Sequence, residues 1–158
     1  MVTYEVTQAL LTVGTIYHVR KPREEEVLYT VTGVLMSPTP SFRLVEGADG
    51  KEIGALMGNF IKTRYEIHVD SKVVASLVFP AVAFKKTLTL TVGSDVYEAD
   101  GGVFRGVFQC KKDDAVMLEI RKELSIRDTF SVKMTDGIPL QVGLLSAVAI
   151  HSRFYEMV

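Results

Sequence analysis

A continuous apolar segment, Ile138 to Ile150, closes this chain. It follows a long region in which apolar and polar residues alternate. Its large side chains point to every side of a helix, which indicates a helix that is buried all round rather than one that lies on a surface. It is also shorter than the roughly 20 apolar residues that cross a bilayer. The other elements of the fold must therefore surround this one helix.

Alternation with period two recurs before the apolar segment, in short runs that are separated by turn residues. This pattern predicts β-strands. The clearest runs are Tyr29–Leu35, Arg64–Val69 and Leu88–Val92, and Pro38 and Pro40 belong to a connection between two strands. The whole chain contains about twelve such runs.

The predicted strands and the predicted helix fit together in a barrel. Side chains just fill a barrel of about eight strands, and the diameter grows with strand number. About twelve strands leave a lumen close to the 10–12 Å girth of a helix, and closure removes exposed sheet edges. We therefore predict a mainly β fold, a closed barrel of about twelve mostly antiparallel strands that encloses a hydrophobic C-terminal α-helix. A sandwich with the helix on one face fits less well, because that helix would show a polar stripe.

The central helix is expected over residues 138–154. Asp136 is a suitable N-cap, and Pro139 suits the first helical turn, where a missing N–H costs nothing. His151, Ser152 and Arg153 restore polarity and are expected to mark where the helix emerges into solvent.

The length of 158 residues suits a single domain, residues 1–158. A weak internal repeat joins residues 29–70 to residues 97–136: Tyr29-x-Val-x-Gly33 matches Tyr97-x-Ala-x-Gly101, and the elements that follow recur in the same order. Such a repeat favours two related halves, although any two β meanders share some of this pattern.

Charge and cysteine content limit the partners and the compartment. Lys and Arg total 18 against 19 for Asp and Glu, so no overall positive field recruits nucleic acid. One cysteine cannot form an internal disulfide, and the N-terminus lacks the pattern of a signal peptide. We expect a cytoplasmic protein without a transmembrane segment, at most peripheral at the inner membrane surface.

The order of several motifs resembles one known family. The motifs are Tyr29-x-Val-x-Gly33, Phe42-x-Leu44, Asp49-Gly50-Lys51, the segment from Tyr97 to Gly101, and Asp136-Gly-Ile-Pro-Leu before a hydrophobic helix. This order, over residues 27–157, resembles the tubby C-terminal-like superfamily, in particular its small LURP-one-related branch.

The resemblance implies a closed barrel around a hydrophobic C-terminal helix, as the alternation pattern does. Relatives include tubby proteins, which bind phosphoinositides at the membrane, and phospholipid scramblases. The small branch implies no enzymatic activity. The cysteine-rich and proline-rich stretches of scramblases are absent from this chain.

No motif for catalysis, cofactor binding or metal ligation stands out. His18, His68 and His151 are far apart in sequence, and Cys110 ends an aromatic strand with no histidine nearby, as expected for a buried, inert thiol. We expect no catalytic residues, no cofactor and no metal site.

Basic clusters are the features that best suit a ligand. Lys85 and Lys86 follow Phe84, and Lys62 and Arg64 enter another strand; paired cations beside an aromatic residue suit an anionic lipid headgroup. Solvated strand ends that discourage edge pairing are the simpler interpretation.

The predicted function is a non-enzymatic binding or adaptor module that associates with anionic phospholipids, such as phosphoinositides, through these four residues. Two alternatives stay open: a barrel that binds a small apolar ligand in its lumen, and an enzyme with a site that the sequence does not reveal.

Overall fold

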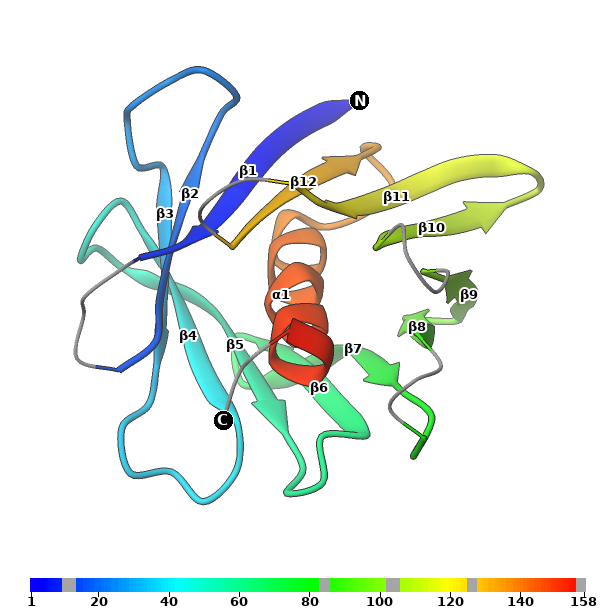
Figure 1. The fold of residues 1–158 in the computed structure, drawn as a ribbon, viewed down its shortest axis with the longest axis horizontal. Coiled ribbons are helices and arrows are strands. Elements are labelled where there is room, and N and C mark those ends of the chain that lie inside the picture. Colours follow the sequence, from blue (N-terminus) through cyan, green and yellow to red (C-terminus); the bar gives the residue numbers. More distant parts are fainter. Residues whose placement is uncertain (10–13, 83–85, 102–105, 125–127, 156–158) are drawn as a thin grey trace.

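The computed structural model describes residues 1–9, 14–82, 86–101, 106–124 and 128–155. Within these residues the chain forms β-strands followed by one C-terminal helical segment (Figure 1). The strands are β1 (Val2–Gln8), β2 (Ile16–Arg20), β3 (Tyr29–Gly33), β4 (Ser41–Glu46), β5 (Glu52–Gly58), β6 (Arg64–Val69), β7 (Lys72–Val78), β8 (Thr87–Val92), β9 (Asp95–Asp100), β10 (Val107–Lys112), β11 (Ala115–Lys122) and β12 (Thr129–Met134).

The strands form one 12-stranded antiparallel sheet that curls into a nearly closed barrel. Strands consecutive in sequence pair with each other, except β9 and β10, and β12 pairs with β1, with Tyr4 opposite Val132. The sheet order begins at β10 and ends at β9. Some Cα atoms of these two strands lie within 8 Å, and Lys112 Nζ lies 3.0 Å from Asp95 Oδ1 across the seam, but the described residues form no ladder there. The predicted barrel is confirmed, with this one open seam.

Side chains alternate between the lumen and the solvent along each strand, as the period of two requires. In β8, Leu88 and Leu90 are buried, whereas Thr87, Thr89 and Thr91 alternate with them and are only partly buried. Cross-strand pairs place inward residues opposite each other, as in Leu56 with Ile67 and Tyr65 with Leu77. The inner faces of the strands thus form one continuous apolar lining.

The lumen is filled by α1 (Leu140–Ile150), which continues into the π-helical turn η1 (His151–Tyr155). Figure 1 shows the helix in the middle of the ring of strands, and every residue from Val142 to Ile150 is buried. Leu144 and Val148 are among them, so the helix occupies the space that a ligand in the lumen would need. The helical residues that the structure describes include no stretch long and apolar enough to cross a membrane.

The helix begins later than predicted, and its cap is not Asp136. A turn closed by the hydrogen bond from Ile138 N to Thr135 O (3.1 Å) intervenes, and Pro139 becomes the N-cap without a side-chain hydrogen bond. The Pro139 carbonyl instead accepts hydrogen bonds from Val142 N (3.0 Å) and Gly143 N (3.2 Å).

Small residues let the strands approach the helix closely. A Cβ atom on Gly143 would collide with the thioether of Met134 in β12, and one on Gly54 in β5 would lie 3.3 Å from Gln141 Cγ. Contacts at this range leave no void, as the packing density of protein interiors requires.

The two ends of the barrel differ. At one end, which we call the turn end, the two-residue turns Asp70-Ser71 and Asp113-Asp114 join strands, with φ between 50° and 64°, the backbone of tight hairpins. At the other end, the loop end, longer connections follow β1, β3, β5, β7, β9 and β11. The helix enters at the turn end and finishes at the loop end.

We expect Leu145→Asp to abolish folding, because it places an unpaired charge among apolar side chains in the lumen. Leu145→Ala should fold but lose about 2–5 kcal/mol of unfolding free energy. Circular dichroism and urea denaturation measure both effects, with Leu124→Asp at an exposed loop-end residue as the control. A soluble, native-like Leu145→Asp protein would show that the helix is not the core.

Candidate functional site at the loop end of the barrel

The last turn of the helix carries a buried polar network. The Tyr17 hydroxyl on β2 lies 2.6 Å from His151 Nδ1, and His151 Nε2 lies 3.1 Å from Asp128 Oδ2. An ionised carboxylate only accepts hydrogen bonds, so Nε2 donates to Asp128, and in the neutral imidazole Nδ1 then accepts from Tyr17. A second pair joins the Tyr65 hydroxyl on β6 to Ser152 Oγ at 2.8 Å.

His151 and Ser152 are therefore not the point where the helix emerges into solvent, which corrects the sequence prediction. Each is only 1% exposed. Buried polar groups need hydrogen-bond partners, and strands far away in sequence supply them. The π-helical turn, a rare form that is frequent at functional sites, carries these residues.

Asp128 is held ionised by its neighbours. Burial by itself raises the pKa of this carboxyl, but hydrogen bonds from Lys122 (2.9 Å) and His151, together with the positive charge of Lys122, outweigh burial and hold the pKa below its ordinary value. The carboxylate thus links the helix end to β11.

Two of the predicted lipid-binding residues meet at the helix end. Lys62 Nζ donates to the carbonyl of Ser152 (3.3 Å), and Lys86 Nζ donates to the Tyr155 hydroxyl (3.4 Å) and lies 4.6 Å from the centre of that ring. Arg64 is exposed at the start of β6, two residues after Lys62. Lys85 lies outside the described residues.

Sequence reasoning did not select two further cations of this site. Arg153 donates to the carbonyls of Pro80 (2.7 Å), Ala81 (3.2 Å) and Ile61 (3.4 Å), which ties two loops to the helix. Lys122 lies 5.8 Å from the centre of the Tyr155 ring. Lys122 belongs to a visible basic pair, Arg121-Lys122, but only the barrel topology brings it to the end of the helix.

These cations have a structural role. The last carbonyls of a helix have no partner within the helix, and the helix dipole places partial negative charge there. Lys62, Lys86, Lys122 and Arg153 bring positive charge to this terminus, so the loop end of the barrel is basic for reasons of stability as well.

The β5–β6 loop presents apolar side chains to water on a fixed backbone. Asn59 Oδ1 accepts hydrogen bonds from the amides of Thr63 (2.8 Å) and Arg64 (3.0 Å), and its carbonyl accepts one from Lys62 N (3.1 Å). Between these bonds, Phe60 is 77% exposed and Ile61 63% exposed.

A second apolar loop lies beside the first. The β3–β4 loop exposes Leu35 and Met36, and together with Phe60 and Lys62 these residues line an open groove of about 440 Å³. Exposed apolar side chains that gather in this way mark interaction surfaces.

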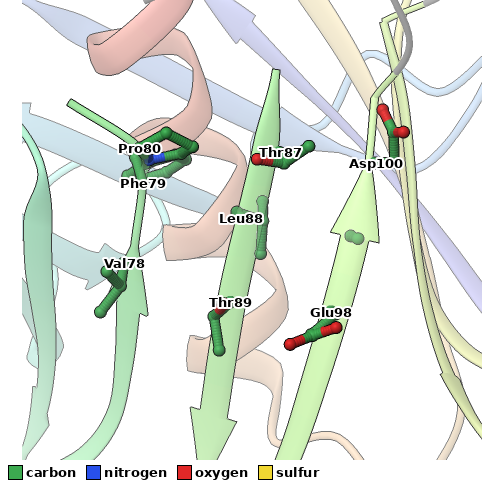
Figure 2. Close-up of a pocket in the computed structure, with 9 residues that line it drawn as sticks. Val78, Phe79, Pro80, Thr87, Leu88, Thr89, Glu98 and Asp100 are labelled. Carbon is green, nitrogen blue, oxygen red and sulfur yellow. The ribbon is translucent and has the colours of Figure 1, made fainter. Parts of the chain in front are cut away.

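Another pocket, of about 490 Å³, lies on the outer wall of the barrel across β7, β8 and β9. Figure 2 shows Glu98 and Asp100 on β9 beside Thr87 and Thr89 on β8, with the helix behind the strands. Its charged side chains are carboxylates from a single strand, so this pocket does not suit an anion.

Among the described residues, the remaining histidine, cysteine and carboxylate side chains form no metal site. Within the part of the chain that the structure describes, no three histidine, cysteine or carboxylate side chains could hold a metal ion. Cys110 is buried, and burial raises the pKa of its thiol to about 12, so the thiolate is scarce at neutral pH.

Comparison with protein-family models gives no match for this chain, and comparison with curated proteins gives none. The fold and the loop-end site therefore carry the functional argument.

We expect the stabilising effect of Asp128 to depend on pH. Its folded-state pKa lies below the unfolded value of about 3.9, so its contribution is complete above that pH and is lost as pH falls through the folded pKa. The difference in unfolding free energy between wild type and Asp128→Asn, measured by urea denaturation, should be largest near pH 7 and should shrink below about pH 4. If this difference in unfolding free energy does not change over the pH range, the ionised Asp128 carboxylate does not stabilise the fold through Lys122 and His151.

Proposed function

We propose that this protein is a non-enzymatic binding module that attaches to anionic membrane surfaces through the loop end of its barrel. The observation that carries the proposal is the β5–β6 loop. It holds Phe60 and Ile61 in water on a backbone fixed by Asn59, next to Lys62 and the exposed Arg64.

The energetics suit reversible attachment. Full burial of a large apolar side chain contributes about 1.5–3 kcal/mol, and a cation near an anionic leaflet contributes about 1 kcal/mol. Two apolar side chains, partly inserted, and two cations together give on the order of 5 kcal/mol. Stable membrane attachment generally needs two such signals, and this loop combines them.

The distribution of charge favours one orientation. The turn end carries Asp70, Asp113 and Asp114, whereas Lys62 and Lys86 lie at the loop end. Lys72 and Lys112 adjoin these aspartates, so an anionic surface favours the loop end over the turn end without strong repulsion at the turn end. The formal net charge of −1 conceals this asymmetry.

The resemblance to the tubby C-terminal-like superfamily supports the same proposal, because tubby proteins bind phosphoinositides at the membrane. We place the chain in the small LURP-one-related branch as part of this proposal. The anionic cytoplasmic leaflet is the surface that a basic loop end fits, so the proposed location is cytoplasmic and peripheral.

We expect Phe60→Ser/Ile61→Ser to reduce binding to vesicles that contain phosphatidylserine and phosphoinositide by about tenfold or more, because the apolar contribution is lost. The matched control is Val73→Ser/Val96→Ser, which removes two exposed apolar side chains on the barrel wall and should bind as wild type does. Vesicle co-sedimentation measures the bound fraction. Equal loss in both variants would contradict docking through the loop end.

Reversal of one charge tests the electrostatic part. Arg64→Glu should weaken binding to acidic vesicles by roughly tenfold at low salt and by less at high salt, where screening is strong. Lys72→Glu makes the same change at the start of β7, at the turn end, and should have little effect. If the wild-type protein does not bind acidic vesicles at low salt, the proposed function is wrong.

A further inference from the structure

The groove between the β3–β4 and β5–β6 loops has the size and lining of a small-molecule site. Its volume of about 440 Å³ lies within the range of about 300–1,000 Å³ that is common for ligand pockets. Val34, Leu35, Met36, Phe42 and Phe60 are among its apolar lining residues.

Backbone hydrogen bonds fix the frame of the groove. Gly33 N donates to Thr15 O (2.7 Å), Val34 N to Ser41 O (2.8 Å), and Gly58 N to Pro40 O (2.7 Å). The groove is therefore formed before a ligand arrives, which lowers the entropic cost of binding.

Lys62 is the one charged side chain among the described residues that line the groove. The local fold sets its position: its φ is 58°, its amide donates to Asn59 O, and its ammonium donates to the carbonyl of Ser152. A fixed positive charge thus adjoins a groove whose lining is mainly apolar, with hydroxyl side chains such as Thr15 and Ser37 between the apolar ones.

This combination selects the chemistry of the ligand. A small soluble anion would leave the apolar walls in water, and an uncharged hydrocarbon would bring no charge to Lys62. An amphiphile with one hydrocarbon chain in the groove and one anionic group at the ammonium satisfies both surfaces.

We propose that the groove binds the hydrocarbon chain of one anionic membrane lipid, with the phosphate or carboxylate of that lipid at Lys62. This inference rests on the proposed function, since the lipid reaches the groove from the membrane on which the loop end docks. It adds a defined site with a stoichiometry of one lipid per chain.

The probe is dodecyl phosphate below its critical micelle concentration, titrated into isotope-labelled protein and followed by amide chemical shifts. We expect saturable one-to-one binding with shifts centred on Gly14, Gly33, Ser41 and Lys62. Dodecyl maltoside has the same chain without charge and should bind at least about fivefold more weakly. Inorganic phosphate has the charge without the chain and should cause no shifts in the groove.

Two variants separate the parts of the site. Lys62→Met keeps the aliphatic stem but removes the charge, so dodecyl phosphate and dodecyl maltoside should bind it alike. Leu35→Glu adds a carboxylate at the exposed rim and should weaken dodecyl phosphate binding by about tenfold, whereas Val96→Glu on the barrel wall should not change it. If Lys62→Met fails to fold, the comparison of dodecyl phosphate binding by Leu35→Glu and by Val96→Glu still tests whether the ligand lies in the groove.

Equal affinity for the charged and the uncharged amphiphile, or shifts spread over the barrel wall, would overturn the inference. Vesicle binding without dodecyl phosphate binding would overturn the groove but leave the proposed function intact. If the protein binds neither vesicles nor dodecyl phosphate, both the groove site and the proposed function are wrong.

Discussion

The fit between α1 and the lumen is the constraint on which the rest of the structure depends. A barrel of twelve strands is too wide for its own inward side chains to fill, and a helix that is apolar on every face cannot stay in water. Insertion of the helix fills the lumen and removes the helix from water, since residues Val142 to Ile150 are buried against the inner faces of the strands. The lack of a side chain at Gly54 and Gly143 sets how closely strand and helix approach. The function must then lie on the outer surface or at the ends of the barrel.

The helix also decides which end of the barrel is basic. Its last turn brings the final helical carbonyls and the negative end of the helix dipole to the loop end. Lys62 and Lys86 hydrogen-bond to groups of that turn, and Arg153, which is part of the turn, donates to the loop beside it. The same cations give the loop end the charge that an anionic surface would recognise, so stability and the proposed binding draw on shared residues. Arg64, Phe60 and Ile61 are exposed instead, so their side chains can serve binding without taking part in these structural contacts.

Left-handed backbone occurs at both ends of the barrel. At the turn end it falls on short polar residues such as Asp70 and Asp113, which tolerate it in tight hairpins, and also on Arg23. At the loop end it falls on Met36 and Lys62, long side chains for which this conformation is uncommon. Both residues line the groove. Strained backbone of this kind persists where the surrounding structure fixes it and is frequent in ligand clamps, which agrees with a preformed site between the two loops.

The sequence by itself determined the architecture. Period-two alternation predicted the strands, and the apolar segment from Ile138 predicted a buried helix, because both signals are local and follow from which faces must avoid water. It also pointed to Lys62, Arg64 and Lys86 as candidate lipid-binding cations.

Only the tertiary structure decided that His151 and Ser152 are buried, because Tyr17 and Tyr65 come from distant strands and Asp128 from the connection before β12. It likewise decided which basic residues share the loop end and that Phe60 and Leu35 lie beside one groove. These properties depend on strand order and on which strand ends lie at the same end of the barrel. No local sequence pattern predicts the pairing of β12 with β1, because the two strands are far apart in the chain.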